Sequence, residues 1–190
     1  CRSTQAAAET ELLAAELTLG TVTEAYSETV PAGQVISQNP AAGTLVAENT
    51  PVNLVVSLGS EPVNVPDAGL AAAIRDQLSL APATPLTRAH MAALDSLSAY
   101  NRDVTDLTGL EYAVNLTNLY AADNALTSAA PLGGLVNLVN VYLGTNLLTD
   151  ASPLAGMPVI TYLDLGNNQL TDTAPLAGLR EPAYSPVVNL

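Results

Sequence analysis

Apolar residues recur with a period of 22 positions between residues 94 and 179. Five columns are apolar and a sixth is Thr: Leu94, Leu116, Leu138 and Ile160; Leu97, Leu119, Val141 and Leu163; Ala99, Ala121, Leu143 and Leu165; Val104, Leu126, Leu148 and Leu170; Thr105, Thr127, Thr149 and Thr171; and Leu110, Leu132, Leu154 and Leu176. A unit this short cannot bury its own apolar face, so at least about three copies must stack. In each copy Leu-x-x-Leu-x-Leu predicts one short strand, and the strands are expected to stack in parallel.

Two further columns indicate how each coil turns. Asn124, Asn146 and Asn168 share one position, which Arg102 occupies in the first copy. A side-chain amide can satisfy backbone groups at the strand-to-loop bend, so this column predicts a structural Asn ladder. Pro131, Pro153 and Pro175 share another position, in the segment that returns to the next strand.

Residues 1–59 follow a different pattern. The segment 6–17 places Ala8, Leu12 and Ala15 at helical spacing among strong helix formers, and Gly20 is expected to mark the end of this helix. Residues 21–30 alternate in character, and together with 33–43 and 51–59 they predict three short strands broken by Pro-Ala-Gly and Asn-Pro-Ala-Ala-Gly turns. This segment reads as a small α+β module.

The stretch between the two patterns divides into a short linker and two helices. Residues 60–66 contain two prolines and are expected to form the linker. Residues 67–93 predict a helical cap, in which Asp67 caps the first helix and Thr87 the second. The apolar face of the cap contains Leu70, Ile74 and Leu78, followed by Met91 and Leu94.

The repeat fails after residue 179. One period beyond Ile160, Leu163 and Asn168 lie Pro182, Ser185 and Leu190, and none of them fits its column. We therefore expect 180–190 to be an irregular tail.

The first segment resembles a PASTA domain. The matching residues are Val30-Pro31-Ala32-Gly33, Val35-Ile36-Ser37-Gln38, Asn39-Pro40-Ala41-Ala42-Gly43 and Val55-Val56-Ser57. The resemblance implies a location outside the bacterial membrane and a role in peptidoglycan binding or spacing. The Val-Pro-x-Val strand that opens the family is missing before the helix, so we expect an N-terminally incomplete domain from a longer protein.

The 22-residue repeat resembles the leucine-rich repeats of internalin-like bacterial surface proteins, and "VPDAGLAAAIRDQL" resembles the internalin-type N-terminal cap. The fold class expected for the chain is a small α+β module plus an α/β leucine-rich-repeat solenoid with short parallel strands and a helical N-terminal cap. The domains expected are 1–59, 67–93 and 94–179, with a linker at 60–66 and a tail at 180–190.

Charge narrows the choice of partner. Eighteen acidic residues against five arginines give a net charge of −13, and there is no lysine. Such a chain cannot neutralise phosphates, which argues against nucleic acid and anionic membranes and favours neutral, basic or cationic partners. Cys1 is the only cysteine, so no internal disulfide forms, and lipidation of Cys1 stays open. No apolar run reaches the roughly 20 residues of a membrane span.

The candidate binding site is the concave face of the solenoid, which we call the strand face. It comprises the residues between the inward leucines, whose side chains point outward. The candidates on it are Tyr100, Asn118, Tyr120, Asn140, Tyr142, Tyr162 and Asp164. Tyrosine is enriched at interfaces, although it is also a good strand-surface residue.

No constellation of catalytic residues is present. His90 has no metal-binding companions at the required spacing, and Asp106, Asp150 and Asp172 recur in a turn position where they can accept local amides. We expect no enzyme activity, no cofactor and no metal. The sequence favours an extracellular bacterial module that binds an unidentified protein through the strand face. The alternatives are peptidoglycan sensing by 1–59, and a binding appendage of a larger cell-surface enzyme.

Overall fold

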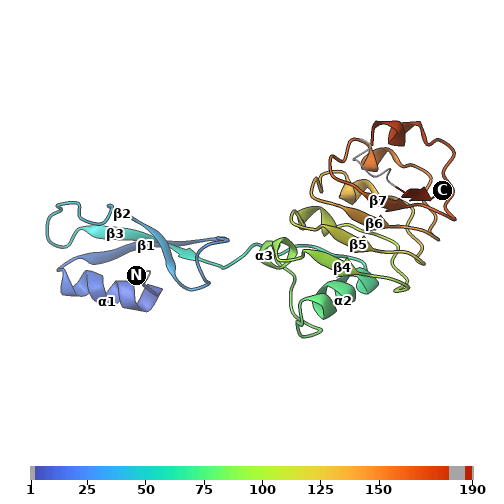
Figure 1. The fold of residues 1–190 in the computed structure, drawn as a ribbon. Coiled ribbons are helices and arrows are strands. Elements are labelled where there is room, and N and C mark those ends of the chain that lie inside the picture. Colours follow the sequence, from blue (N-terminus) through green and yellow to red (C-terminus); the bar gives the residue numbers. More distant parts are fainter. Residues whose placement is uncertain (1–2, 180–186, 190) are drawn as a thin grey trace. The chain divides into compact units, whose positions relative to one another are not determined.

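A computed structural model of the chain describes residues 3–179 and 187–189. The chain divides into two compact units, Cys1–Glu61 and Pro62–Leu190, each with its own apolar core (Figure 1). The linker between the two units is therefore shorter than the 60–66 expected from the sequence. Val63 is buried in the core of the second unit, and Pro62 forms a β-bridge with Thr87. An apolar side chain at position 63 gains more by packing on the cap than by staying in water.

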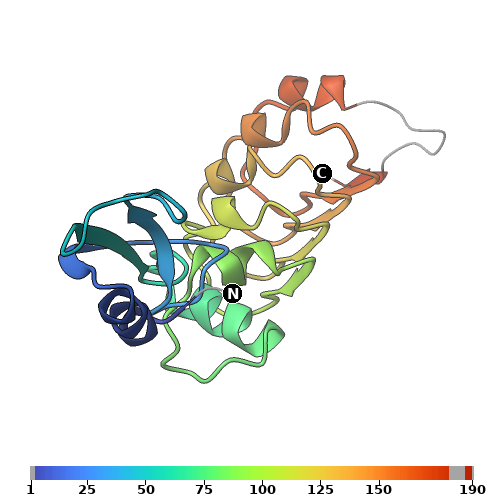
Figure 2. The same cartoon turned by 90° about the vertical axis from the view of Figure 1, so that its left-hand side faces the viewer.

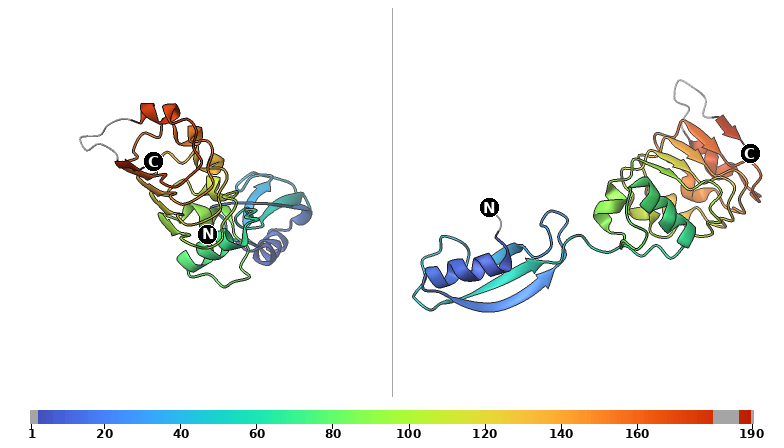
Figure 3. Two further views of the ribbon diagram at one scale, coloured as in Figure 1. Left: turned by 90° about the vertical axis from the view of Figure 1, so that its right-hand side faces the viewer. Right: turned by 90° about the horizontal axis from the view of Figure 1, so that it is seen from below.

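The first unit is a helix packed on a three-stranded sheet (Figure 3, right). Its elements are α1 (Gln5–Ala14), β1 (Thr18–Ala25), β2 (Val35–Asn39) and β3 (Pro51–Ser57). The central strand β3 pairs in parallel with β1 and antiparallel with β2. Leu12 of α1 packs against two inward residues of β3, Val52 and Leu54. This is the small α+β module that the alternation of apolar residues predicts.

Gly20 does not end the helix, contrary to the expectation. Helix α1 ends at Ala14, and Glu16 takes the left-handed conformation with φ of 57°. Gly20 lies inside β1, at an irregularity in the pairing with β3, where the side-chain oxygen of Asn53 accepts the Thr21 N–H at 2.7 Å. A Cβ at position 20 would collide with that oxygen. The glycine is thus needed for a close approach.

The second unit begins with the expected helical cap. Helix α2 (Ala68–Gln77) is capped by Asp67, which accepts the Leu70 N–H at 2.9 Å, and Leu70 and Ile74 are fully buried. Helix α3 (Arg88–Ala92) is capped by Thr87, and its Met91 is fully buried. The cap covers the apolar end of the first coil, which would otherwise face water.

Four coils then follow with a strict period. The strands β4 (Ser96–Ser98), β5 (Asn118–Tyr120), β6 (Asn140–Tyr142) and β7 (Tyr162–Asp164) form a parallel sheet in which each residue pairs with the one 22 positions on. Short 3-10 turns form the opposite side of the coils (Figure 2). They are η1 (Leu110–Tyr112), η2 (Ala130–Leu132), η3 (Ser152–Leu154) and η4 (Ala174–Gly178). The leucine columns fill the space between these two sides.

The tail is not irregular throughout. Residues Val187–Asn189 form β8, which extends the sheet by pairing in parallel with β7. The partner of Leu163 is Val188, 25 positions on rather than 22. A comparison at fixed period therefore aligns the wrong residues, which is why the sequence pattern missed this strand. The remainder of the tail, 180–186 and 190, lies outside the described residues.

Candidate interaction surface

A ladder of buried and half-buried amides joins the coils beneath the strand face. Asn146 is 5% exposed, and its Oδ1 accepts the Leu126 N–H of the preceding coil at 3.0 Å. Its Nδ2 donates to the carbonyls of Ala121 and Leu143, each at 3.0 Å. Asn124 and Asn168 form the same kinds of bond one coil before and after. Each amide thus satisfies backbone groups of two coils at the bend.

Arg102 occupies the amide position of the first coil. No coil precedes it there, and its guanidinium instead pairs with Asp76 of α2 at 2.7 Å. This ion pair lies at the surface and contributes little stability. Its position explains the break in the Asn column, because the first coil contacts the cap rather than another repeat.

Three tyrosines of the strand face stack on one another. The rings of Tyr120 and Tyr142 have centroids 4.9 Å apart and an interplanar angle of 17°. The rings of Tyr142 and Tyr162 are 4.6 Å apart at 31°. Tyr120 and Tyr142 pair in register, whereas Tyr162 pairs in register with Asn140 and reaches Tyr142 diagonally. We call these three side chains the tyrosine stack.

A polar row runs beside the tyrosine stack. The Asn140 amide donates to the Asn118 side-chain oxygen at 2.7 Å, and Asn118 donates to the Thr117 hydroxyl at 2.8 Å. Both candidate asparagines are therefore hydrogen-bonded to neighbours on the same surface. Both side chains are half-exposed, so their polar atoms also face the surface.

Acidic groups flank the tyrosines. Asp164 lies above Gly144, where a Cβ would come within 2.9 Å of its Oδ2. Tyr100 is 56% exposed, and the carboxylate of Asp123 lies near its hydroxyl. Hydrogen bonding to Asp123 and the negative charge of that carboxylate raise the pKa of Tyr100. Sequence reasoning missed Asp123. The available signal was its position three residues after Tyr120, where the chain turns with φ of 53°.

The pKa of Tyr142 is also raised. The first cause is burial of its hydroxyl, followed by the charges of the ionisable neighbours Tyr120, Tyr162 and Asp164. Both effects disfavour the phenolate. The hydroxyl of Tyr142 is accordingly a neutral hydrogen-bond donor and acceptor at physiological pH.

The described residues contain no group of three or more His, Cys, Asp or Glu side chains that could hold a metal ion. His90 is half-buried, and its Nδ1 has no hydrogen-bond partner. The recurring aspartates cap turns: Asp106, Asp150 and Asp172 each accept the backbone N–H two residues on at 2.8 Å. In the first unit, a cleft of about 280 Å³ lies between α1 and β2 and includes Glu11 and Gln38. Within 3–179 and 187–189 no helix has the length and apolarity to cross a membrane.

Family comparisons identify both units. Residues 2–58 match the PASTA domain, and residues 114–156 match Leucine Rich repeats (2 copies). The chain therefore contains a PASTA domain followed by a leucine-rich-repeat region, in the order that the sequence motifs predict. Domains of these two types are typically non-catalytic.

Individual relatives agree with this division. A stretch of 55 residues is 47% identical to a probable serine/threonine-protein kinase of Clostridium perfringens, covering 27% of this chain and 8% of the kinase. A stretch of 38 residues is 55% identical to the serine/threonine-protein kinase PrkC of Bacillus subtilis, covering 20% of this chain and 6% of PrkC. The chain thus spans less than a tenth of the length of these curated relatives.

Among solved structures, an internalin (InlF) of Listeria monocytogenes superposes with a TM-score of 0.62 and 32% identity. The match covers 69% of this chain and 38% of the internalin. The internalin-like fold class predicted from the 22-residue repeat is confirmed.

Proposed function

We propose that this chain is the binding part of a bacterial cell-surface protein and that its strand face recognises a protein partner. The observation that carries the proposal is the tyrosine stack, in which three large amphipathic side chains are held together on the outer side of a rigid sheet. Tyrosine gives much contact area at low entropic cost, because it has only two side-chain torsions. Rings already fixed by neighbours lose still less freedom on binding.

The PASTA domain would serve as a cell-wall anchor or spacer. Its match to the PASTA family and its likeness to parts of two bacterial serine/threonine-protein kinases support a location outside the membrane. The cleft between α1 and β2 favours a second candidate function, binding of a peptidoglycan fragment. The chain covers only a small part of its kinase relatives. A third candidate function is therefore that of a binding appendage of a larger cell-surface enzyme.

The test of protein recognition is capture of surface proteins from candidate host or neighbouring bacterial cells by the immobilised full chain. The test variant is Tyr120→Ala/Tyr142→Ala. The matched control is Val114→Ala/Val136→Ala, which truncates two exposed side chains outside the strand face. Loss of a captured protein with the tyrosine variant alone supports the proposal. Equal capture by both variants would overturn it.

The wall-binding role is tested by co-sedimentation with insoluble peptidoglycan at two salt concentrations. The full chain is compared with residues 62–190, which contain a complete core of their own. Pelleting of the full chain alone assigns wall binding to the PASTA domain. If neither pellets, the anchor role is wrong and the spacer role remains.

A further inference from the structure

The tyrosine stack is closed at Tyr142 and open at Tyr120. Tyr142 has a ring against each of its faces. Among the described residues Tyr120 has a ring on one side only, and its in-register neighbour on the other side is Ser98. Adjacent strands lie about 4.8 Å apart, close to the spacing of stacked rings. The small side chain of Ser98 cannot continue the stack, so the face of Tyr120 turned toward β4 has no aromatic neighbour among the described residues, and we call it the free face.

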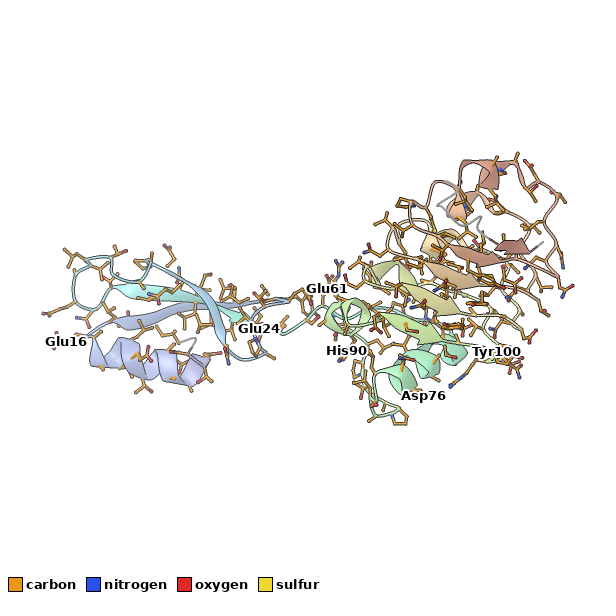
Figure 4. All side chains as sticks on the ribbon, viewed as in Figure 1. Glu16, Glu24, Glu61, Asp76, His90 and Tyr100 are labelled. Carbon is orange, nitrogen blue, oxygen red and sulfur yellow. The ribbon has the colours of Figure 1, made fainter. Side chains whose placement is uncertain are left out.

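The surroundings of the free face are negatively charged. Tyr100 follows Ser98 by two residues on the same side of the strand, and the Asp123 carboxylate lies near its hydroxyl (Figure 4 labels Tyr100). Between residues 94 and 179 there are eight acidic residues and a single basic one, Arg102. The guanidinium of Arg102 is already paired with Asp76. No cation of the described solenoid is thus available to cover the ring.

We propose that the free face of Tyr120 above Ser98 binds an arginine or lysine side chain of the partner, so that the partner presents a basic surface. This inference rests on the proposed recognition of a protein by the strand face. A cation over an aromatic face is attracted by the ring quadrupole, and the Asp123 carboxylate supplies the counter-charge. Arginine fits best, because its guanidinium is planar and can stack on the ring, and its N–H groups suit hydrogen bonds to carboxylates.

Charge and shape argue against other occupants. An acidic side chain would meet Asp123 without any cation to offset the repulsion. A sugar platform needs broad open ring faces, but both faces of Tyr142 are covered by its neighbours. A flat cation needs only the one open face that Tyr120 offers.

The experiment measures binding of a fluorescent nine-residue peptide that contains three arginines among glycines and serines. A matched peptide has citrulline, the uncharged analogue with the same shape, at the three positions. Fluorescence anisotropy is recorded with the full chain at low and physiological salt. We expect the arginine peptide to bind more tightly than the citrulline peptide at both salt concentrations.

Three variants locate the site. Ser98→Tyr adds a ring that continues the stack and covers the free face, while Tyr120→Leu removes the ring face. Each should reduce the preference for arginine by about three- to tenfold. Thr127→Tyr adds a tyrosine at an exposed position outside the strands and should leave the preference unchanged. Circular dichroism of each variant verifies that it is folded.

The outcomes separate this inference from the proposed function. An arginine preference that survives in Ser98→Tyr and Tyr120→Leu reflects only the overall negative charge and overturns the inference. Protein capture that still depends on Tyr120 and Tyr142 would then leave the proposed function standing. If binding increases in Ser98→Tyr, the surface accepts aromatic contacts rather than a cation, and the inference is wrong.

Discussion

Replacing Asn146 by alanine should destabilise the solenoid far more than the loss of an exposed polar side chain would. The amide makes three hydrogen bonds at 3.0 Å, to Leu126, Ala121 and Leu143, and is 5% exposed. Alanine leaves the Leu126 N–H without a partner at a site that water reaches poorly. It also removes one donor from each carbonyl, although Ala121 still accepts from Asn124 and Leu143 still accepts from Asn168. At about 1 kcal/mol for each lost bond, the free energy of unfolding should fall by about 3 kcal/mol.

The assay is urea-induced unfolding of residues 62–190, followed by far-UV circular dichroism and by tyrosine fluorescence. The chain has no tryptophan, so its intrinsic fluorescence comes from tyrosine. A loss of about 3 kcal/mol moves the midpoint by about 1–2 M urea. Because the bonds of Asn146 join two coils, the slope should also fall if the coils begin to unfold separately.

The matched control is Asn137→Ala. Asn137 is exposed and donates one hydrogen bond, to the Val114 carbonyl at 2.8 Å. Water can replace that bond, so the loss should stay below about 1 kcal/mol. Equal losses for the two variants would refute the reasoning, because the recurring asparagine would then be an ordinary turn residue.

Three further predictions concern the cap and the strand face. Burial alone would raise the pKa of Asp67, but hydrogen bonds to backbone N–H groups and to Thr105 outweigh it and lower the pKa. The stability that ionised Asp67 contributes should be present above about pH 4 and be lost as the pH falls through the folded-state pKa. Asp67→Ala should lower the free energy of unfolding by about 2 kcal/mol at neutral pH. When the free energy of unfolding is measured against pH, the variant should lose less of it in acid than the unmodified protein does. The pKa of Tyr142 is raised, first by burial, so its contribution to stability should be present below about pH 10 and decline as the pH rises through the folded-state pKa. Tyr142→Phe should therefore reduce the fall in melting temperature at alkaline pH. A melting temperature that falls equally in both proteins would contradict the prediction. Gly69→Ala should lower the melting temperature although alanine favours helices, because its Cβ would collide with the Arg102 carbonyl.

Most of the solenoid could be predicted because its pattern repeats. The columns of leucine specify which side chains face inward, and the 22-residue period specifies the pairing of β4 to β7. Asp67 and Thr87 could be identified as caps from their position before an amphipathic segment. All these features depend on residues a few positions apart or one full period apart, and such spacings are visible in the chain.

The sequence also predicted which side chains belong to the strand face, but not how they contact one another. Tyr162 stands in the column of Asn118 and Asn140, so the column pattern separates it from Tyr120 and Tyr142. Its ring nevertheless lies 4.6 Å from that of Tyr142. A diagonal contact depends on side-chain torsions and strand twist, which no column records.

The sequence by itself determined the two-unit order, the helical cap, the parallel coils and the acidic charge, because periodicity and composition are properties of the chain. Only the tertiary structure decided that β8 continues the sheet after β7 and that position 20 requires a glycine. It also decided which face of the Tyr120 ring stays open. Each of these depends on the distance through space between atoms of segments that are far apart in the chain. Packing sets that distance, and the order of residues along the chain does not.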